Sequence, residues 1–324
     1  MDEAHLKATL KQLKKLHQSD EVDLGDKIAE VEAKLAQLAG AAKSGQTAKA
    51  DDWDRVKLAR HPQRPHALDY VEMIFDGFYE LHGDRLFGDD GAMVTGLAQF
   101  GGSTVAVVAQ QKGRDLEENQ ARNYGLPHPE GYRKAQRIMK LAERFGFPVI
   151  TLIDSGGAFP GKSAEERNIG GALAQSIYVM SGLQVPIVVT IIGEGNSGGA
   201  IGIGVGDRVL IMENAYYSVI SPEGCAAILW RDRAKAPEAA RAMRLTAPHL
   251  LGLGIVDEVV PEPPGGAHKA PEQAAAALQE ALLRTLSELS KLDSQTLWEQ
   301  RLKRYQSYGV FEELSEEVAS EVKA

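Results

Sequence analysis

The chain contains one cysteine, Cys225, among its 324 residues. A single cysteine cannot form an internal disulfide, a zinc ribbon or a thiolate cluster, so we expect no metal in this chain. It also favours a reducing, cytoplasmic location, where disulfides are rare. No apolar run approaches the ~20 residues of a membrane-spanning helix. Residues 1–5 lack the basic and apolar regions of a signal peptide, so none is predicted.

The chain also lacks a surplus of basic residues. Lysine and arginine number 36 against 45 aspartates and glutamates, which gives a net charge of −9. This balance argues against broad nucleic-acid binding, although it leaves room for local basic contacts. Aromatic residues are few, at 6%, whereas 33 glycines make up about a tenth of the chain, against a usual ~7%. So many glycines require a structural or functional reason.

The sequence predicts three segments. Residues 1–55 form an N-terminal helical arm, because leucine and isoleucine recur at spacings of three and four on both sides of Gly25. Such a helical hairpin is marginal alone, so we expect it to pack on the remainder of the chain or on a partner. Residues 56–262 form the core, and residues 263–324 form a linker and the closing helices.

The core begins with a helix, a β-hairpin and a second helix. The pattern predicts helices over 68–81 and 129–145, and between them strands over 92–100 and 103–111 joined by Gly101-Gly102. Further along the chain, strands are predicted over 209–212, 216–220 and 255–260, and helices over 222–231, 237–245, 271–289 and 294–305.

A unit of strand, glycine-rich loop and helix occurs twice. A buried strand over 149–154 runs into a loop over 155–161 and a helix over 164–180. A second buried strand over 187–192 runs into a loop over 193–200 and another helix. The repeat predicts an α/β fold with parallel strands, whose carboxyl ends carry the two loops side by side.

The first loop matches a phosphate-binding motif. Residues 156–163 satisfy G-x-x-x-x-G-K-[ST] between a strand and a helix. Two features argue against a nucleotide site. Pro160 removes an N–H from the stretch that would cradle phosphate. The next strand ends in Gly193-Glu194 instead of the aspartate that usually serves magnesium.

The second loop matches a nucleophile motif. Residues 195–199 satisfy G-x-S-x-G, which would place Ser197 at a strand-to-helix turn. A serine hydrolase also needs a histidine and an acid, and the candidates stand in no telling local context. These candidates are His249, His268, Asp207 and Asp257. The hydroxyl of Ser197 could equally serve as a helix cap.

A third interpretation uses both loops together. Glycine allows a substrate oxygen to approach the backbone closely, and two neighbouring loops can each donate one N–H to the same oxyanion. The candidate donors are Gly156 or Gly157 in the first loop and Gly198 or Gly199 in the second. Losing one such donor typically costs ~2.7–4 kcal/mol of transition-state stabilisation. This interpretation fits the abundant glycine best, while plain tight turns remain the alternative.

Several stretches together resemble one enzyme family. They are residues 58–65, 111–114, 129–135, 164–167, 193–195, 197–200, 218–226, 261–263 and 265–268. In this order they are similar to the alpha subunit of the carboxyltransferase of bacterial acetyl-CoA carboxylase. The resemblance is close over about 55–270 and looser in the terminal helices.

The resemblance implies a fold and an activity. The expected fold is the α/β crotonase (ClpP/crotonase-like) superhelix of repeated ββα units, flanked by the N-terminal hairpin and the C-terminal helices. The family transfers a carboxyl group from carboxybiotin, held on a biotin carrier protein, to acetyl-CoA. The product is malonyl-CoA, in the first committed step of fatty acid biosynthesis. The resemblance also implies a further partner besides the carrier protein, the biotin carboxylase, which uses ATP.

The resemblance also implies partners and site residues. A beta subunit of similar fold carries a zinc ribbon and assembles as two alpha and two beta chains. The alpha loops, with Gly156 or Gly157 and Gly198 or Gly199, are expected to bind the ureido oxygen of biotin. Lys112 and Arg114, at the end of the hairpin, are expected to contact substrate, for example the phosphates of CoA.

The chain departs from the family pattern at a few positions. Ser155, Gly156 and Phe159 stand where the family usually has Thr, Pro and Tyr, and Asn196 stands where glycine is common. The lysine and serine of the phosphate-binding match fall on variable positions. Two other functions stay open: a stand-alone hydratase or serine hydrolase using Ser197, and a non-catalytic assembly scaffold.

Overall fold

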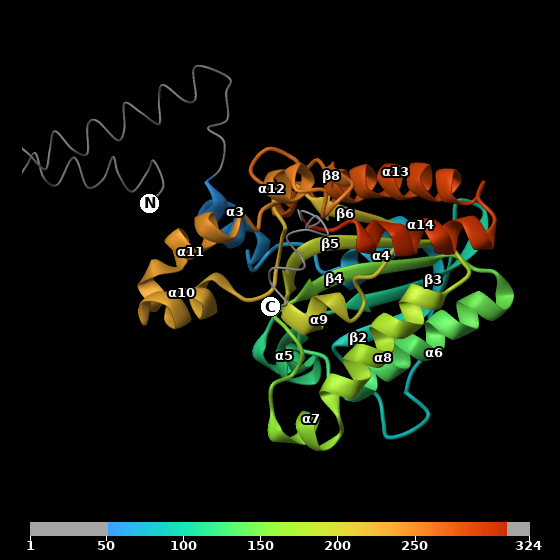
Figure 1. Cartoon of the computed structure of the whole chain (residues 1–324), viewed down its shortest axis with the longest axis horizontal. Coiled ribbons are helices and arrows are strands. Elements are labelled where there is room, and N and C mark those ends of the chain that lie inside the picture. Colours follow the sequence, from blue (N-terminus) through green and yellow to red (C-terminus); the bar gives the residue numbers. More distant parts are fainter. Residues whose placement is uncertain (1–50, 310–324) are drawn as a thin grey trace, which may run out of the picture. The chain divides into compact units, whose positions relative to one another are not determined.

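A mixed β-sheet forms the centre of the computed structural model, which describes residues 51–309 (Figure 1). In those residues eight strands join in the order β1-β2-β3-β4-β5-β6-β8, and β7 pairs with β5. The strands are β1 Asp76–Glu80, β2 Met93–Phe100, β3 Ser103–Gln110, β4 Val149–Ser155, β5 Ile187–Asn196, β6 Arg208–Met212, β7 Tyr216–Ser218 and β8 Glu258–Val260.

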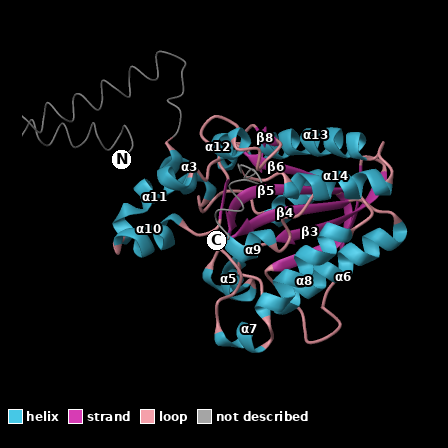
Figure 2. Cartoon of the chain, in the orientation of Figure 1, coloured by secondary structure: helices cyan, strands magenta, loops and turns pink. Residues whose placement is uncertain are grey.

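Helices cover the sheet and extend past its end. They are α3 Asp52–Ala59, α4 Ala67–Ile74, α5 Leu116–Ala121, α6 Pro129–Phe145, α7 Lys162–Glu166, α8 Ile169–Gly182, α9 Ser197–Ile201, α10 Pro222–Trp230, α11 Ala236–Met243, α12 Ala247–Gly252, α13 Pro271–Leu289 and α14 Ser294–Gln306. Figure 2 shows α6 and α8 on one side of the sheet and α13 on the other. Helices α10 and α11 lie beyond the carboxyl ends of the strands.

The predicted hairpin and the repeated unit are confirmed. Strands β2 and β3 pair antiparallel from Phe100 and Ser103 outward, on either side of Gly101-Gly102. Strands β3, β4, β5, β6 and β8 then pair parallel. Strand β4 is buried along its whole length, as expected for an apolar run in a parallel sheet.

Helices α6 and α13 have the predicted bounds, most of the other elements differ from the prediction by one to three residues at an end, and three differ by more. The helix predicted over 68–81 ends at Ile74, because the chain enters strand β1, where Gly77 has a positive φ of 59°. The helix predicted over 164–180 is two helices, divided where Asn168 adopts a φ of 64° and caps α8. The strand predicted over 187–192 continues to Asn196, so the first half of the loop predicted over 193–200 is strand.

The predicted segment boundaries are described only in part. Of the helical arm expected over 1–55, residues 1–50 lie outside the described residues, as does the chain after residue 309. The boundary expected after residue 55 falls inside α3. From Asp52 onward the described residues belong to one unit, whose main core lies between the sheet and its helices.

Candidate active site

The two glycine loops touch each other at the carboxyl ends of β4 and β5. A Cβ on residue 199 would lie 2.5 Å from the nitrogen of Ala158, so only glycine permits this approach. The Gly199 carbonyl accepts hydrogen bonds from Gln110 Nε2 at 2.7 Å and from Tyr132 Oη at 3.2 Å. The start of α9 is therefore fixed against the first loop, and the predicted juxtaposition of the loops is confirmed.

Ser155 organises the first loop from within. Its Oγ lies 2.7 Å from both the Gly125 and the Gly157 carbonyl oxygens, and it accepts the Gly157 N–H at 3.1 Å. Gly157 has a φ of 147°, a conformation that side chains disfavour. The hydroxyl of Ser155 thus links the first loop to the Gly125 carbonyl and to the backbone of Gly157.

Ser197 has no catalytic partner among the described residues. Its φ of 55° is unusual for a non-glycine residue and marks a sharp turn between β5 and α9. Both candidate histidines have other partners: His249 lies 3.4 Å from Asp52, and the ring of His268 stacks on His61 at 3.7 Å. The candidate acids also have other partners, since Asp207 pairs with Arg301 and Asp257 pairs with Arg304. These contacts argue against a triad built on Ser197.

Replacing Ser197 with glycine tests the hydrolase alternative. We expect Ser197→Gly to keep its activity and to gain stability, because glycine adopts a positive φ without strain and non-glycine residues in that region cost ~1–3 kcal/mol. The measurement compares turnover and urea unfolding of the variant with those of the unchanged chain. Abolished turnover in a folded variant would show that the hydroxyl takes part in the chemistry.

The phosphate-binding match does not form a phosphate site. Lys162 begins α7, and its side chain is 89% exposed and pairs with Glu166 at 3.2 Å on the surface. A P-loop lysine instead points back over the phosphates that the loop encloses. The match to G-x-x-x-x-G-K-[ST] is therefore accidental in this chain.

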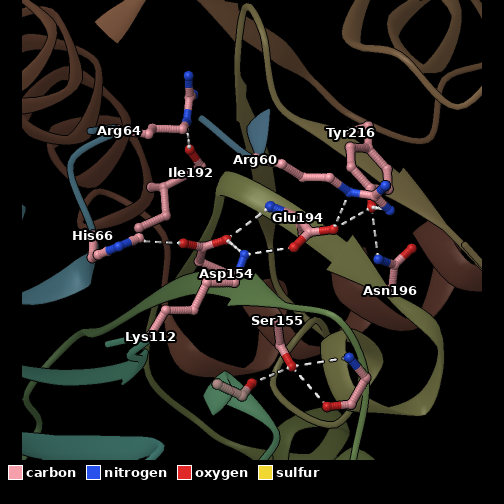
Figure 3. A network of polar contacts seen from close by, with 12 residues as sticks. Arg60, Arg64, His66, Lys112, Asp154, Ser155, Ile192, Glu194, Asn196 and Tyr216 are labelled. Carbon is pink, nitrogen blue, oxygen red and sulfur yellow. Dashed lines mark hydrogen bonds and ion pairs between the residues drawn. The ribbon is translucent and has the colours of Figure 1, made fainter. Parts of the chain in front are cut away.

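Lys112 and Arg114 both form ion pairs within the chain. Lys112 Nζ lies 2.6 Å from Asp154 Oδ1 and 2.7 Å from Glu194 Oε2, between the ends of β4 and β5 (Figure 3). Arg114 pairs with Asp69 at a more exposed position. Their predicted contact with substrate stays a prediction. In this structure the ammonium of Lys112 is shared between two carboxylates, one on β4 and one on β5.

A wider polar network surrounds this ammonium. Arg60 Nε lies 2.6 Å from Glu194, and its other nitrogens contact Glu223 and the hydroxyl of Tyr216. That hydroxyl donates to Glu194 at 2.6 Å and accepts from Asn196 at 2.8 Å (Figure 3). The sequence-based interpretation assigned no role to this network. Its signal was a carboxylate near the end of each predicted buried strand, Asp154 and Glu194, because a buried carboxylate is costly without a paired cation.

Opposite charges keep the central groups of the network ionised. Burial alone would raise the pKa of Asp154, but Lys112 and His66 outweigh it and hold that pKa well below its usual range. Burial acts on Glu194 in the same direction, and Lys112 and Arg60 lower its pKa to about 2. Burial would lower the pKa of Lys112, yet its two carboxylates raise it. At neutral pH the ammonium and both carboxylates are therefore charged.

A cavity of about 670 Å³ borders the second loop. Its walls include Ser197, Gly198, Tyr217, Leu250 and Tyr305, and most of its surface is apolar. This size and lining are typical of sites for small organic ligands. In residues 51–309 no group of histidine, cysteine or acidic side chains has the geometry to hold a metal ion. No helix in that part of the chain is long and apolar enough to cross a membrane.

Two solved structures share the fold of this chain. The transcarboxylase 12S core, crystallised with methylmalonyl-CoA, superposes with a TM-score of 0.58 at 20% identity over 72% of this chain, which spans 44% of that larger chain. A Pseudomonas malonate decarboxylase hetero-tetramer in complex with coenzyme A also gives 0.58, at 15% identity over 79% of this chain and 96% of the other. The chain therefore shares its α/β fold with these two structures, which agrees with the predicted crotonase-like fold.

Sequence comparison narrows the class to one family. Residues 2–309 match the model of the acetyl co-enzyme A carboxylase carboxyltransferase-like family. The alpha subunit of acetyl-coenzyme A carboxylase carboxyl transferase from a strain of Thermus thermophilus is 54% identical over 93% of this chain and 96% of its own length. That of Bordetella avium is 50% identical over 96% of both chains. The chain belongs to this family of carboxyltransferase alpha subunits.

Proposed function

We propose that this chain supplies one half of a carboxyltransferase site that moves a carboxyl group from carboxybiotin to acetyl-CoA and releases malonyl-CoA. The observation that carries the proposal is the contact of Gly199 with the first loop, which brings two glycine-rich turns to one point. Membership of the family supports the choice of reaction. This transfer would commit carbon to fatty acid biosynthesis.

The chemistry needs stabilisation of negative charge more than it needs a titrating side chain. Carboxybiotin supplies CO2 and leaves a ureido anion, which takes the α-proton of acetyl-CoA so that the enolate attacks CO2. In this chain, one N–H from each loop would donate to the developing charge on the ureido oxygen. The cavity beside Ser197 and Gly198 supports this role, because it gives a small, largely apolar ligand room next to the second loop.

A proline at residue 156 distinguishes the two possible donors of the first loop. A Cβ on Gly156 would meet only Leu126, at 3.6 Å, and the family commonly has proline there. We therefore expect Gly156→Pro to keep nearly the full transfer rate, because the Gly157 N–H remains. The rate of malonyl-CoA formation checks this. A loss of about 100-fold in a folded variant would instead identify the Gly156 N–H as the donor.

A beta chain would complete the site. We infer that two alpha and two beta chains assemble, that zinc is held by beta, and that the biotin carrier protein and biotin carboxylase act with them in the cytoplasm. Large apolar side chains around α10 are exposed to water in the chain by itself, and a group of such side chains is typical of a protein interface. They are Val219, Ile228, Leu229 and Trp230. We propose this surface, called the α10 surface, as the contact with beta.

Reconstitution tests the proposed function. We expect the purified chain alone to show neither carboxylation of biotin from malonyl-CoA nor decarboxylation of malonyl-CoA, and mixing with its beta chain to restore both. Acyl-CoA hydratase or hydrolase activity of the chain alone would contradict the proposal. Labelling of Ser197 by a fluorophosphonate would point specifically to a hydrolase.

A further inference from the structure

A bulge in strand β5 sets the position of the second glycine loop. The ladder between β4 and β5 pairs Ile153 with Ile191, and its next pair is Ser155 with Gly195. Strand β5 thus advances four residues while β4 advances two, and residues 192–194 lie outside the regular pairing. Bulges of this kind bend a strand and change the direction of the residues after it. Here the bulge directs the start of α9 toward the first loop.

Charged side chains replace the backbone partners that the bulge lacks. Asp154 Oδ1 accepts the Glu194 N–H at 2.9 Å, and Arg64 Nε donates to the Ile192 carbonyl at 2.8 Å (Figure 3). Gly193 packs directly on the same carboxylate, since a Cβ there would lie 2.8 Å from Asp154 Cγ. The shape of the bulge therefore depends on the Asp154 carboxylate staying in its place.

Lys112 holds that carboxylate in place. Its ammonium lies between Asp154 and Glu194, whose side chains are only 2% and 14% exposed. Without the ammonium, two poorly solvated carboxylates would face each other across the bulge, and like charges at this separation repel strongly. Arg60 would stay beside Glu194 and His66 beside Asp154, but the two carboxylates would lose the one cation that they share, and removing a partner from a buried charge group is costly. Either the bulge would then open, or one of the two carboxylates would take up a proton.

We propose that Lys112 is a positioning residue that fixes the bulge of residues 192–194 and, through it, the contact between the two glycine loops. The inference rests on the proposed function, because the alignment of the loops matters when their amides share one oxyanion. It differs from the predicted contact of Lys112 with CoA, because here the ammonium acts on two carboxylates of the chain itself and not on a substrate.

Steady-state kinetics of the complex with beta separates the two roles. We expect Lys112→Met to lower kcat by about 100-fold, as small misplacements at active sites do. The KM for the biotin substrate should rise while the KM for acyl-CoA stays unchanged. Lys112→Arg should regain part of the loss, because it keeps a cation between the carboxylates. Lys140→Met, at an exposed position of α6, is the matched control and should change nothing. A rise confined to the KM for acyl-CoA would assign Lys112 to CoA and overturn the proposal.

Hydrogen exchange tests the positioning without any measurement of activity. In Lys112→Met, amides of residues 193–201 and 155–161 should exchange faster than in the unchanged chain, while those of α6 should not. If exchange rises in this way but the unchanged complex transfers no carboxyl group, the positioning role stands and the proposed function fails. Unchanged exchange in both loops would overturn the positioning role even if the activity of the variant falls.

Discussion

Replacing Gly199 with valine is expected to lower the rate of malonyl-CoA formation by at least about 100-fold, the effect of losing one oxyanion donor. A side chain at this position would lie 2.5 Å from the Ala158 nitrogen, so the two loops would have to separate. The Gly199 carbonyl is held by Gln110 and Tyr132, which limits how far α9 can retreat. The rate is measured with the beta chain in excess and both substrates saturating.

A matched glycine provides the control for this variant. A Cβ on Gly170, in helix α8, would meet no atom within 4 Å. Gly170→Val should therefore leave both the rate and the assembly with beta unchanged. Size-exclusion chromatography of Gly199→Val with beta shows whether the complex still forms. An unchanged rate in an intact complex would favour a non-catalytic scaffold over the proposed site.

The largest expected effect on stability comes from Arg301, far from the loops. Its guanidinium is 1% exposed and forms a two-pronged pair with Asp207, at 2.9 and 2.8 Å. It also donates to the carbonyls of Met180, Leu183 and Val185. We expect Arg301→Met to lower the free energy of unfolding by about 3–5 kcal/mol, because the buried carboxylate and three carbonyls lose their donor. Equilibrium unfolding in urea measures this loss.

An exposed ion pair between an arginine and a glutamate serves as the comparison for this variant. Arg284 pairs with Glu258 on the surface, where water solvates both groups after either is removed. Arg284→Met should leave the urea midpoint unchanged. If Arg301→Met and Arg284→Met change the free energy of unfolding by the same amount, the buried contacts of the Arg301 guanidinium do not stabilise the fold.

The parts of the site that follow from local pattern were predictable from the sequence. Apolar runs ending in glycine, followed by helical periodicity, predicted both β4 and β5 and the neighbouring loops. The helical pattern over 129–145 also predicted both ends of α6, which begins at Pro129 and is followed by Gly146 in a left-handed conformation. These features depend on residues that are close in the chain, so their physics is visible in a short window.

The network beneath the loops was not predictable in the same way. Lys112 and Asp154 are 42 positions apart, and Lys112 and Glu194 are 82 apart, so no window of the sequence places them together. Their meeting depends on the pairing of β3 with β4 and of β4 with β5, and the irregular register near Glu194 is not visible in the apolar pattern of the strand. A lysine after a strand therefore indicated a substrate contact, whereas in the fold it lies between two carboxylates.

The most direct test is a structure of the chain with its beta partner and a biotin ligand. The proposed site predicts that the ureido oxygen of biotin lies about 2.7–3.1 Å from one backbone N–H of each glycine loop. In the first loop that donor should come from Gly156 or Gly157, and in the second from Gly198 or Gly199. A biotin ring bound away from both loops, or held there by side chains alone, would contradict the proposed role of the glycines.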